Sequence, residues 1–320
     1  MSAVLGPISV ARPNPSSFAD FDLSTVPSPC YVINLAQFEA NLAILRDISQ
    51  RSGADILLAL KAFSLPAVAP LVQTYLLGVC ASGLYEARFG RENFGGVVHS
   101  YGAAYPESHL PELVQLSDHL VFNSLGQLQR AQPALAAKPE LKVGLRLNPE
   151  VQLTQTALYD PSAPHSRLGL ARDSFTDDQV PDLVTGFHCH NLCGNHLPEL
   201  KRTVASLAEK FPNLLARADW INLGGGHAIC EPDYDRDGLV EFLIDFAARH
   251  KVKVYLEPGE TTAYQVGGLV TTVLDTSFNG KGIAILDCSS TAHIPDSIEM
   301  PYRVDIQGAG LPGEKPHDFR

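Results

Sequence analysis

The chain has little positive charge and no long apolar run. It holds 24 Lys and Arg against 35 Asp and Glu, a net charge of −11, so it offers no broad basic surface for a nucleic-acid backbone. No stretch approaches the ~18 apolar residues of a membrane span, and the first thirty residues lack the basic-then-apolar order of a signal peptide. We therefore expect a cytoplasmic protein with neither nucleic acid nor membrane as a partner.

Several common ligand motifs are also missing. The six cysteines are scattered and form no disulfide framework, so reduced thiols are expected. There is no Walker-type loop and no Gly-x-Gly-x-x-Gly after the first strands, which argues against nucleoside triphosphates and dinucleotides. His188, Cys189, His190 and Cys193 lie close together with His196, but alternation on a strand separates Cys189 from the histidines, and no second group has zinc-ligand spacing. We predict no metal site.

What the sequence does contain is a regular alternation of short β-prone runs with helical stretches. A chain of 320 residues suits a large α/β domain with a smaller appendage. Eight runs in about 200 residues predict a parallel (β/α)8 TIM barrel, although an open doubly wound sheet would show the same alternation. The predicted strands are Ile56–Lys61, Gly78–Ser82, Val97–Tyr101, His119–Asn123, Lys142–Asn148, Gly186–Asn191, Trp220–Gly225 and Lys253–Gly259.

Strand parity then indicates which side chains enter the barrel, because alternate residues of a strand face opposite sides. In Lys142–Asn148 the apolar residues should face the helices, which turns Gly144 and Arg146 inward. The same test turns Lys61 and Glu257 inward and places His190 beside them. All four polar residues fall near the carboxyl ends of their strands, where barrel enzymes carry their chemistry.

These residues are of the types that bind pyridoxal 5′-phosphate. Lys61 lies in an apolar run, and burial would lower the pKa of its amine and make it a nucleophile for an aldehyde. A lysine whose ammonium extends to solvent is the alternative. Gly224, Gly225 and Gly226 follow a strand and can hold a phosphate on backbone amides, although a simple turn would look the same. An inward Glu257 could pair with a pyridine nitrogen or, alternatively, with Arg146, and His190 could stack on the ring.

The motifs resemble those of the carboxynorspermidine/carboxyspermidine decarboxylases, which belong to the alanine-racemase-like, fold-type III group. The matching segments are Ala59–Ser64, His190–Cys193, Leu223–His227, Tyr255–Glu260 and Glu299–Arg303. The wider group usually carries Arg after Glu-Pro-Gly, where this branch and this chain carry Glu260. The resemblance implies decarboxylation of carboxynorspermidine or carboxyspermidine in polyamine synthesis, with pyridoxal phosphate as cofactor and a homodimer as the assembly.

By the same resemblance, individual residues take on roles. Lys61 would bind the cofactor aldehyde as a Schiff base, His190 would stack on its ring, the three glycines would hold its phosphate and Glu257 would pair with its ring nitrogen, with Arg146 in support. Substrate contacts would come from Glu260 and from the stretch 287–296, which contributes the residues Asp287, His293 and Asp296. Carboxylates there would replace the water around the substrate's ammonium groups.

The resemblance also implies a domain plan. Residues 1–29, rich in Pro and Ser, form an arm, residues 30–264 the cofactor-binding barrel, and residues 265–320 part of a C-terminal β domain. Departures from the family pattern at Gly194, Ala228 and Ala292 concern the substrate more than the cofactor. The family continues beyond the Gly313–Pro316 segment, and without that continuation we expect unpaired strand edges and reduced turnover. A diaminopimelate-type decarboxylase, a racemase and a non-catalytic cofactor carrier remain alternatives.

Overall fold

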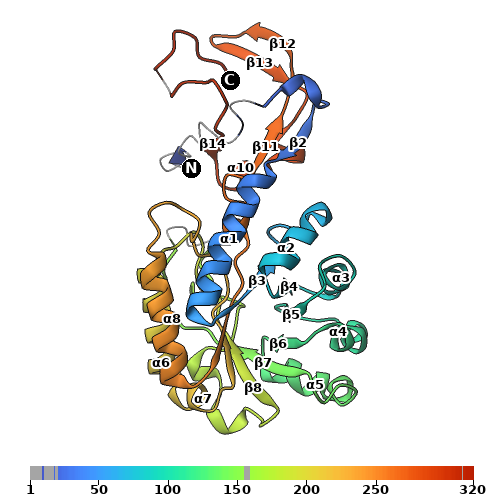
Figure 1. Cartoon of the computed structure of the whole chain (residues 1–320), viewed down its shortest axis with the longest axis vertical. Coiled ribbons are helices and arrows are strands. Elements are labelled where there is room, and N and C mark those ends of the chain that lie inside the picture. Colours follow the sequence, from blue (N-terminus) through green and yellow to red (C-terminus); the bar gives the residue numbers. More distant parts are fainter. Residues whose placement is uncertain (1–8, 11–17, 19–20, 155–158, 312) are drawn as a thin grey trace. The chain divides into compact units, whose positions relative to one another are not determined.

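A computed structural model describes residues 9–10, 18, 21–154, 159–311 and 313–320. The chain divides into two compact units (Figure 1). The larger unit is Phe38–Tyr264, and the smaller one combines Met1–Gln37 with Gln265–Arg320. Much of the predicted 1–29 arm (residues 1–8, 11–17 and 19–20) lies outside the described residues.

The larger unit is a closed barrel of eight strands, as predicted. Every neighbouring pair is parallel, and the last strand pairs with the first to close the ring. The strands are β3 (Asp55–Ala59), β4 (Gly78–Ala81), β5 (Val97–Tyr101), β6 (His119–Phe122), β7 (Lys142–Arg146), β8 (Val184–His188), β9 (Trp220–Asn222) and β10 (Lys253–Leu256). Closure excludes the open doubly wound sheet. Most strands end one to three residues earlier than predicted, because the polar residues that follow them form loops.

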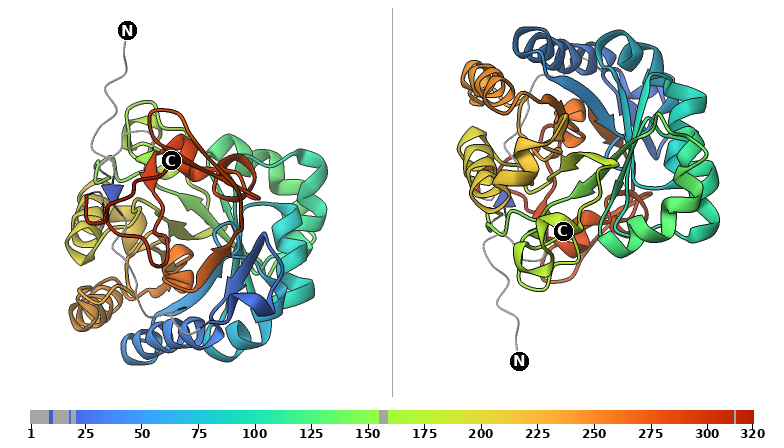
Figure 2. Two further views of the ribbon diagram at one scale, coloured as in Figure 1. Left: turned by 90° about the horizontal axis from the view of Figure 1, so that it is seen from above. Right: turned by 90° about the horizontal axis from the view of Figure 1, so that it is seen from below.

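Helices surround the strands of this unit (Figure 2). They are α1 (Leu35–Ser52), α2 (Ala69–Tyr75), α3 (Leu84–Phe89), α4 (Leu110–Leu116), α5 (Leu125–Leu135), α6 (Leu197–Lys210), α7 (Pro212–Ala216) and α8 (Arg236–His250). Shorter turns of helix are η2 (Pro66–Val68), η3 (Gly90–Phe94, a π-helix), η4 (Glu107–His109), η6 (Arg172–Ser174), η7 (Asp177–Gln179) and η8 (Glu260–Ala263). The β7–β8 connection carries the 3-10 turns η6 and η7.

Helix α6 shows why these stretches are helical and which way they face. Leu200, Val204 and Leu207 recur at helical spacing and are buried, while the charged residues between them are exposed. Helix α8 begins where the Asp235 side chain accepts a hydrogen bond from the Gly238 N–H at 2.9 Å. It ends at Lys251 in the left-handed conformation. The apolar stripes thus hold the helices against the barrel.

The lower part of the barrel lumen is filled by aromatic and apolar side chains. Leu57, Val121, Trp220 and Tyr255 form one buried cluster. The Trp220 ring lies against two strands that carry glycine, and a Cβ at Gly186 would lie 2.1 Å from the indole, one at Gly144 2.5 Å from it. The inward position predicted for Gly144 is therefore confirmed. This packing leaves the open end of the lumen at the carboxyl ends of the strands.

The smaller unit contains three two-stranded sheets. β2 (Cys30–Ile33) pairs antiparallel with β11 (Gly267–Val270), and β12 (Val273–Phe278) pairs antiparallel with β13 (Gly282–Leu286). β1 (Ser9–Val10) pairs parallel with β14 (Tyr302–Arg303). The unit also holds η1 (Leu23–Thr25), α9 (Ser290–His293) and α10 (Asp296–Glu299).

Two features of this unit bear on the expectations from sequence. Residues 30–37 belong to it and not to the barrel, because β2 forms its ladder with β11. The boundary therefore falls at Phe38 and not at Cys30. All six residues of β12 are exposed. Among the described residues, no helix is long and apolar enough to cross a membrane.

Candidate active site

A pocket opens in the barrel unit at the carboxyl ends of the strands. It is lined by Ala59, Lys61, Cys80, Ala81, Ser82, Tyr101, Arg146, His188, His190 and Glu257. The four polar residues that the sequence analysis singled out on strands therefore share one pocket. Each lies at the end of its strand or within two residues of it, on β3, β7, β8 and β10. This is the end of a barrel at which catalytic groups gather.

Lys61 lies on the loop after β3 and is exposed. The expectation of a buried amine is wrong, because β3 ends at Ala59 and the chain then turns, with the Ala62 and Phe63 N–H groups donating to the Ala59 carbonyl. Lys61 nevertheless lines the pocket, so its amine is accessible to a bound molecule. Its reactivity toward an aldehyde then depends on its position beside the other groups and not on desolvation.

Glu257 is a buried carboxylate that contacts an amide and two histidines. Its Oε1 accepts a hydrogen bond from Asn222 Nδ2 at 2.6 Å and lies 3.4 Å from His99 Nδ1, and its Oε2 lies 3.3 Å from His188 Nε2. Burial alone would raise the pKa of this carboxyl, but the contacts with His188 and His99 outweigh it and hold the pKa well below its usual range. Glu257 is therefore an anion that lines the pocket.

His190 is a neutral imidazole fixed by the glycine loop. The Gly225 N–H donates to His190 Nδ1 at 3.0 Å, and Arg146 Nη2 donates to the His190 carbonyl at 2.7 Å. Burial, followed by the charges of Lys61 and Arg146, holds the pKa of His190 well below its ordinary value. The Arg146 guanidinium lies 4.7 Å from the ring centroid of Tyr101. The flat uncharged ring of His190 is thus presented to the pocket in one orientation.

The loop Gly224–Gly226 needs glycine at each position. Gly224 and Gly226 have φ angles of +71° and +79°, a region that other residues rarely adopt. A Cβ at Gly225 would lie 2.1 Å from the carbonyl oxygen of Glu257, and one at Gly226 would lie 2.0 Å from that of Leu192. The loop therefore carries no side chains that would keep a phosphate away from its backbone, although the Gly224 and Gly225 N–H groups donate to Asn222 Oδ1 and His190 Nδ1.

These features fit pyridoxal phosphate. An accessible amine, an anionic carboxylate and a neutral flat imidazole line the pocket, and the glycine loop is bonded to that imidazole through the Gly225 N–H. Each of these groups matches one part of the cofactor. Glu257 is not neutralised by Arg146, as the alternative from sequence required, because its hydrogen-bond partners are Asn222 and His188. Its charge remains for a cationic partner.

The predicted substrate residues fall in both units. Glu260 begins η8 in the barrel unit and is exposed. Asp287, His293 and Asp296 belong to the smaller unit. Asp287 is already engaged there, since its carboxylate accepts hydrogen bonds from Ser28 Oγ and Thr271 Oγ1, both at 2.7 Å, and from the Thr272 N–H. These contacts lower its pKa and leave less of the carboxylate for a ligand.

The other two residues of the smaller unit have looser local contacts. Asp296 accepts a hydrogen bond from the Tyr302 hydroxyl at 2.9 Å, and both residues are part of the α10 segment and the strand after it. His293 Nδ1 accepts from the Ser289 N–H at 3.2 Å. Asp296 accepts the bond from Tyr302 on Oδ2, and it stays a candidate for a cationic ligand.

Sequence reasoning missed His99, His188 and Asn222 as groups that contact Glu257. All three are buried. Alternation on β5 and β9 could have predicted that His99 and Asn222 face the lumen. His99 shares a face with Tyr101, which lines the pocket. Asn222 shares a face with Trp220, which fills the lumen.

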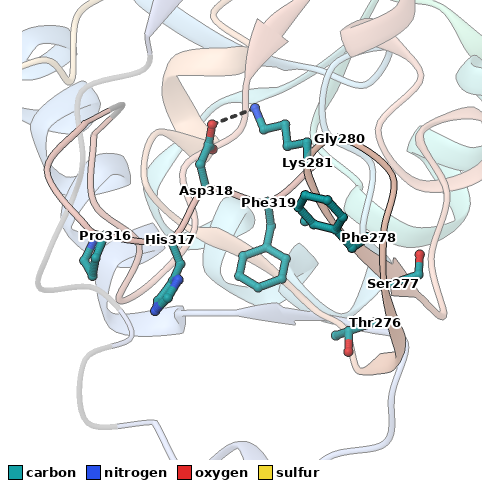
Figure 3. Close-up of a pocket in the computed structure, with 10 residues that line it drawn as sticks. Thr276, Ser277, Phe278, Gly280, Lys281, Pro316, His317, Asp318 and Phe319 are labelled. Atoms are coloured by element: carbon teal, nitrogen blue, oxygen red, sulfur yellow. Dashed lines mark ion pairs between the residues drawn. The ribbon is translucent and has the colours of Figure 1, made fainter.

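Two further groupings lie away from this pocket. In the barrel unit, single ligand atoms of His196, Glu231 and Asp233 lie within 4.8 Å of one another. Sequence spacing did not indicate this set, because it joins two separate loops. In the smaller unit, a second pocket lies between the β12–β13 hairpin and the last residues, where Lys281 pairs with Asp318 at 2.6 Å (Figure 3). Neither contains a residue predicted for the site.

Comparison with known proteins places the chain among decarboxylases. It is 37% identical over 286 residues to the carboxynorspermidine/carboxyspermidine decarboxylase of Campylobacter jejuni, covering 89% of this chain and 74% of that protein. The protein of the same description from Herminiimonas arsenicoxydans is 38% identical, covering 89% of this chain and 77% of that one. The chain belongs to the carboxynorspermidine/carboxyspermidine decarboxylase family. The predicted family is thereby confirmed.

The family includes variation in substrate. A carboxyaminopropylagmatine decarboxylase from Synechocystis is 39% identical over 292 residues, covering 91% of this chain and 75% of that protein. No protein-family model matches the chain.

Solved structures agree with the family assignment. The crystal structure of carboxynorspermidine decarboxylase with norspermidine, from Campylobacter jejuni, has a TM-score of 0.80 at 37% identity and covers 87% of this chain and 72% of that chain. Diaminopimelate decarboxylase from Helicobacter pylori shares the fold, with a TM-score of 0.73 at 16% identity. The chain is thus a member of a family of pyridoxal-phosphate-dependent decarboxylases with the fold-type III barrel.

Proposed function

We propose that this protein binds pyridoxal phosphate and removes the α-carboxylate of carboxynorspermidine or carboxyspermidine. The observation that carries the proposal is the meeting of Lys61, His190 and Glu257 in one pocket beside the glycine loop. The family assignment supports it, because relatives at 37 to 38% identity carry that activity in their descriptions.

Each residue has a part in holding the cofactor. Lys61 supplies the amine that binds the aldehyde, and Gly224–Gly226 supply bare backbone for the phosphate. The anionic Glu257 keeps a proton on the pyridine nitrogen, and the neutral His190 covers one ring face without competing for that proton. When bound, the cofactor accepts the electron pair that carbon dioxide leaves behind. Arg146 fixes the backbone of His190.

The substrate's cationic end needs an acidic partner, and we propose Glu260 of the barrel unit for it; Asp296 of the smaller unit stays a prediction from the resemblance. Asp287 and His293 remain weaker candidates, since both already have local hydrogen bonds. The Synechocystis relative is described as acting on carboxyaminopropylagmatine, which ends in a guanidinium and not in an ammonium. Carboxylates form hydrogen-bonded ion pairs with ammonium and with guanidinium groups. The terminal group of the substrate is therefore the feature to vary in an assay. A homodimer and a cytoplasmic location stay predictions.

Cofactor attachment is tested by trapping. The purified chain is incubated with pyridoxal phosphate, reduced with borohydride and digested for mass spectrometry. We expect the reduced adduct on Lys61 and its loss in Lys61→Arg, with the adduct retained in Lys142→Arg, which alters an exposed lysine at the start of β7. An unmodified Lys61 in the unchanged chain would contradict the proposal.

Substrate class is tested by measuring carbon dioxide release from carboxynorspermidine, carboxyspermidine, carboxyaminopropylagmatine and diaminopimelate. We expect release from the carboxylated polyamines, and a KM at least tenfold higher in Glu260→Gln with the cofactor absorbance unchanged. Release from diaminopimelate alone would indicate the diaminopimelate-type alternative, and cofactor binding without any release would indicate a carrier. The rate in this assay also tests the expectation of reduced turnover.

A further inference from the structure

Asn222 occupies the point where the glycine loop and the site carboxylate meet. It is the last residue of β9, two positions after Trp220 and two before Gly224, and it is 0% exposed. A fully buried amide is costly unless its donors and acceptor are all used. The partners of Asn222 therefore indicate why it is there.

The Asn222 side chain uses both ends of its amide. Its Oδ1 accepts a hydrogen bond from the Gly224 N–H at 2.8 Å. Because a backbone N–H can only donate, this contact fixes which end of the amide is oxygen. The Nδ2 then donates to Glu257 Oε1 at 2.6 Å and to His99 Nδ1 at 2.8 Å.

A backbone contact closes the arrangement into a ring. The Glu257 N–H donates to the Gly224 carbonyl at 2.8 Å, so Gly224 is bound to Glu257 directly and also through Asn222. The neighbouring Gly225 N–H donates to His190. The glycine loop, the carboxylate and the imidazole of the site are thereby parts of one hydrogen-bonded assembly.

Asn222 also affects charge. An amide donates to Glu257 without carrying a positive charge, so it stabilises the anion and leaves its charge for another cation. Asn222 Nδ2 also donates to His99 Nδ1, and the group nearest Glu257 Oε1 is the amide, at 2.6 Å against 3.4 Å for the imidazole.

We propose that Asn222 is a positioning residue that couples phosphate recognition by the glycine loop to the charge of Glu257. This inference rests on the proposed function, since it assumes that the loop holds a phosphate and that Glu257 pairs with the ring nitrogen. Breaking the amide's contacts should therefore change two properties of the bound cofactor together, namely discrimination for the phosphate and the pH dependence of binding.

The experiment uses two substitutions that separate these effects. Asn222→Asp keeps an acceptor for the Gly224 N–H but replaces the donor facing Glu257 with a second carboxyl group. Asn222→Ala removes both contacts. The control is Asn41→Ala, which deletes another buried amide of the barrel unit, one that donates to the Thr262 and Tyr264 carbonyls and not to the site. Far-UV circular dichroism and thermal unfolding establish that each variant is folded.

Binding is read without catalysis. The chain has one tryptophan, Trp220, so quenching of its fluorescence gives dissociation constants for pyridoxal phosphate and for pyridoxal, which lacks the phosphate. We expect Asn222→Ala to lower the preference for the phosphorylated form at least tenfold and to weaken pyridoxal binding as well. Asn222→Asp should keep the preference within about threefold, and its affinity should fall at least tenfold between pH 6.5 and 8.5, as the second carboxyl loses its proton.

Each result decides something. If Asn222→Ala matches the unchanged chain, or loses affinity only as Asn41→Ala does, the coupling is overturned. If Asn222→Ala does not fold, the pH dependence of Asn222→Asp decides, and a pH response equal to that of the unchanged chain overturns the proposal. If the unchanged chain fails to bind pyridoxal phosphate, the proposed function fails first, and this is seen before any variant is compared.

Discussion

Glu257 is a buried carboxylate surrounded by an amide and two imidazoles. Burial keeps the pKa of one of them, His188, below its ordinary value even beside this anion. A lysine or arginine in the same place would hold the carboxylate as well but would cancel its charge. At the scale of residues, the site therefore combines an anion with donors that leave the anion available.

His227 offers a residue-scale prediction of pH dependence. It follows the glycine loop, is 3% exposed and has no hydrogen-bond partner on either ring nitrogen within the described structure, and burial lowers its pKa to about 4. The unfolded chain takes up this proton near pH 6.5, and the folded chain only near pH 4. Stability is thus complete above about pH 6.5 and falls by about 3 kcal/mol as the pH drops through that window.

Urea unfolding at several pH values between 4 and 7.5 measures this effect. We expect His227→Leu to show a smaller loss of stability over the window than the unchanged chain, by about 3 kcal/mol at its acidic end. Other groups titrate in both proteins and cancel in the difference. Parallel curves for the two proteins would show that His227 takes up its proton normally when folded.

At the scale of elements, the barrel could be predicted from the sequence, but the conformations of its loops could not. Strand parity placed Gly144 and Arg146 inward from local pattern alone, because alternation on a strand is a property of neighbours. The exposure of Lys61 depended on where β3 ends, which an apolar run of seven residues does not reveal. The partners of Glu257 come from three strands distant in sequence, so only tertiary structure joins them.

The packing of the Trp220 ring against β8 gives a prediction at the scale of elements. A Cβ at Gly186 would lie 2.1 Å from the indole, so Gly186→Ala must displace β8 or the ring. We expect a loss of about 1 to 3 kcal/mol in the free energy of unfolding, typical of an overpacked core, with a red shift of the tryptophan emission. Gly83→Ala is the control, because a Cβ there meets no atom within 4 Å. Equal stabilities of the two variants would contradict this packing.

At the scale of the whole molecule, the family could be predicted from short motifs spread over most of the chain, and the comparisons confirm it over about 90% of its residues. The smaller unit was harder to predict. Its strands are short and largely exposed, so they lack the apolar alternation from which pairing can be inferred. The chain spans about three quarters of the length of the relatives.

Net charge gives a whole-molecule prediction. The chain carries −11, and a field of this sign attracts a polyamine substrate and is screened by salt. We expect kcat/KM for carboxynorspermidine to fall about tenfold between 50 and 500 mM NaCl. Sucrose at matched osmolarity should have little effect. A salt dependence as weak as that of a substrate with a single amine would show that long-range attraction plays no part.

The packing around Trp220 also limits how a molecule can enter. His99 and His119 lie with ring centroids 3.8 Å apart, and both contact the Trp220 and Tyr255 rings beneath the pocket. These rings therefore close the barrel lumen below the pocket. A ligand bound at the closed end of the lumen can extend only toward the carboxyl ends of the strands. The far end of a long, thin ligand therefore lies beside the residues at the mouth of the pocket.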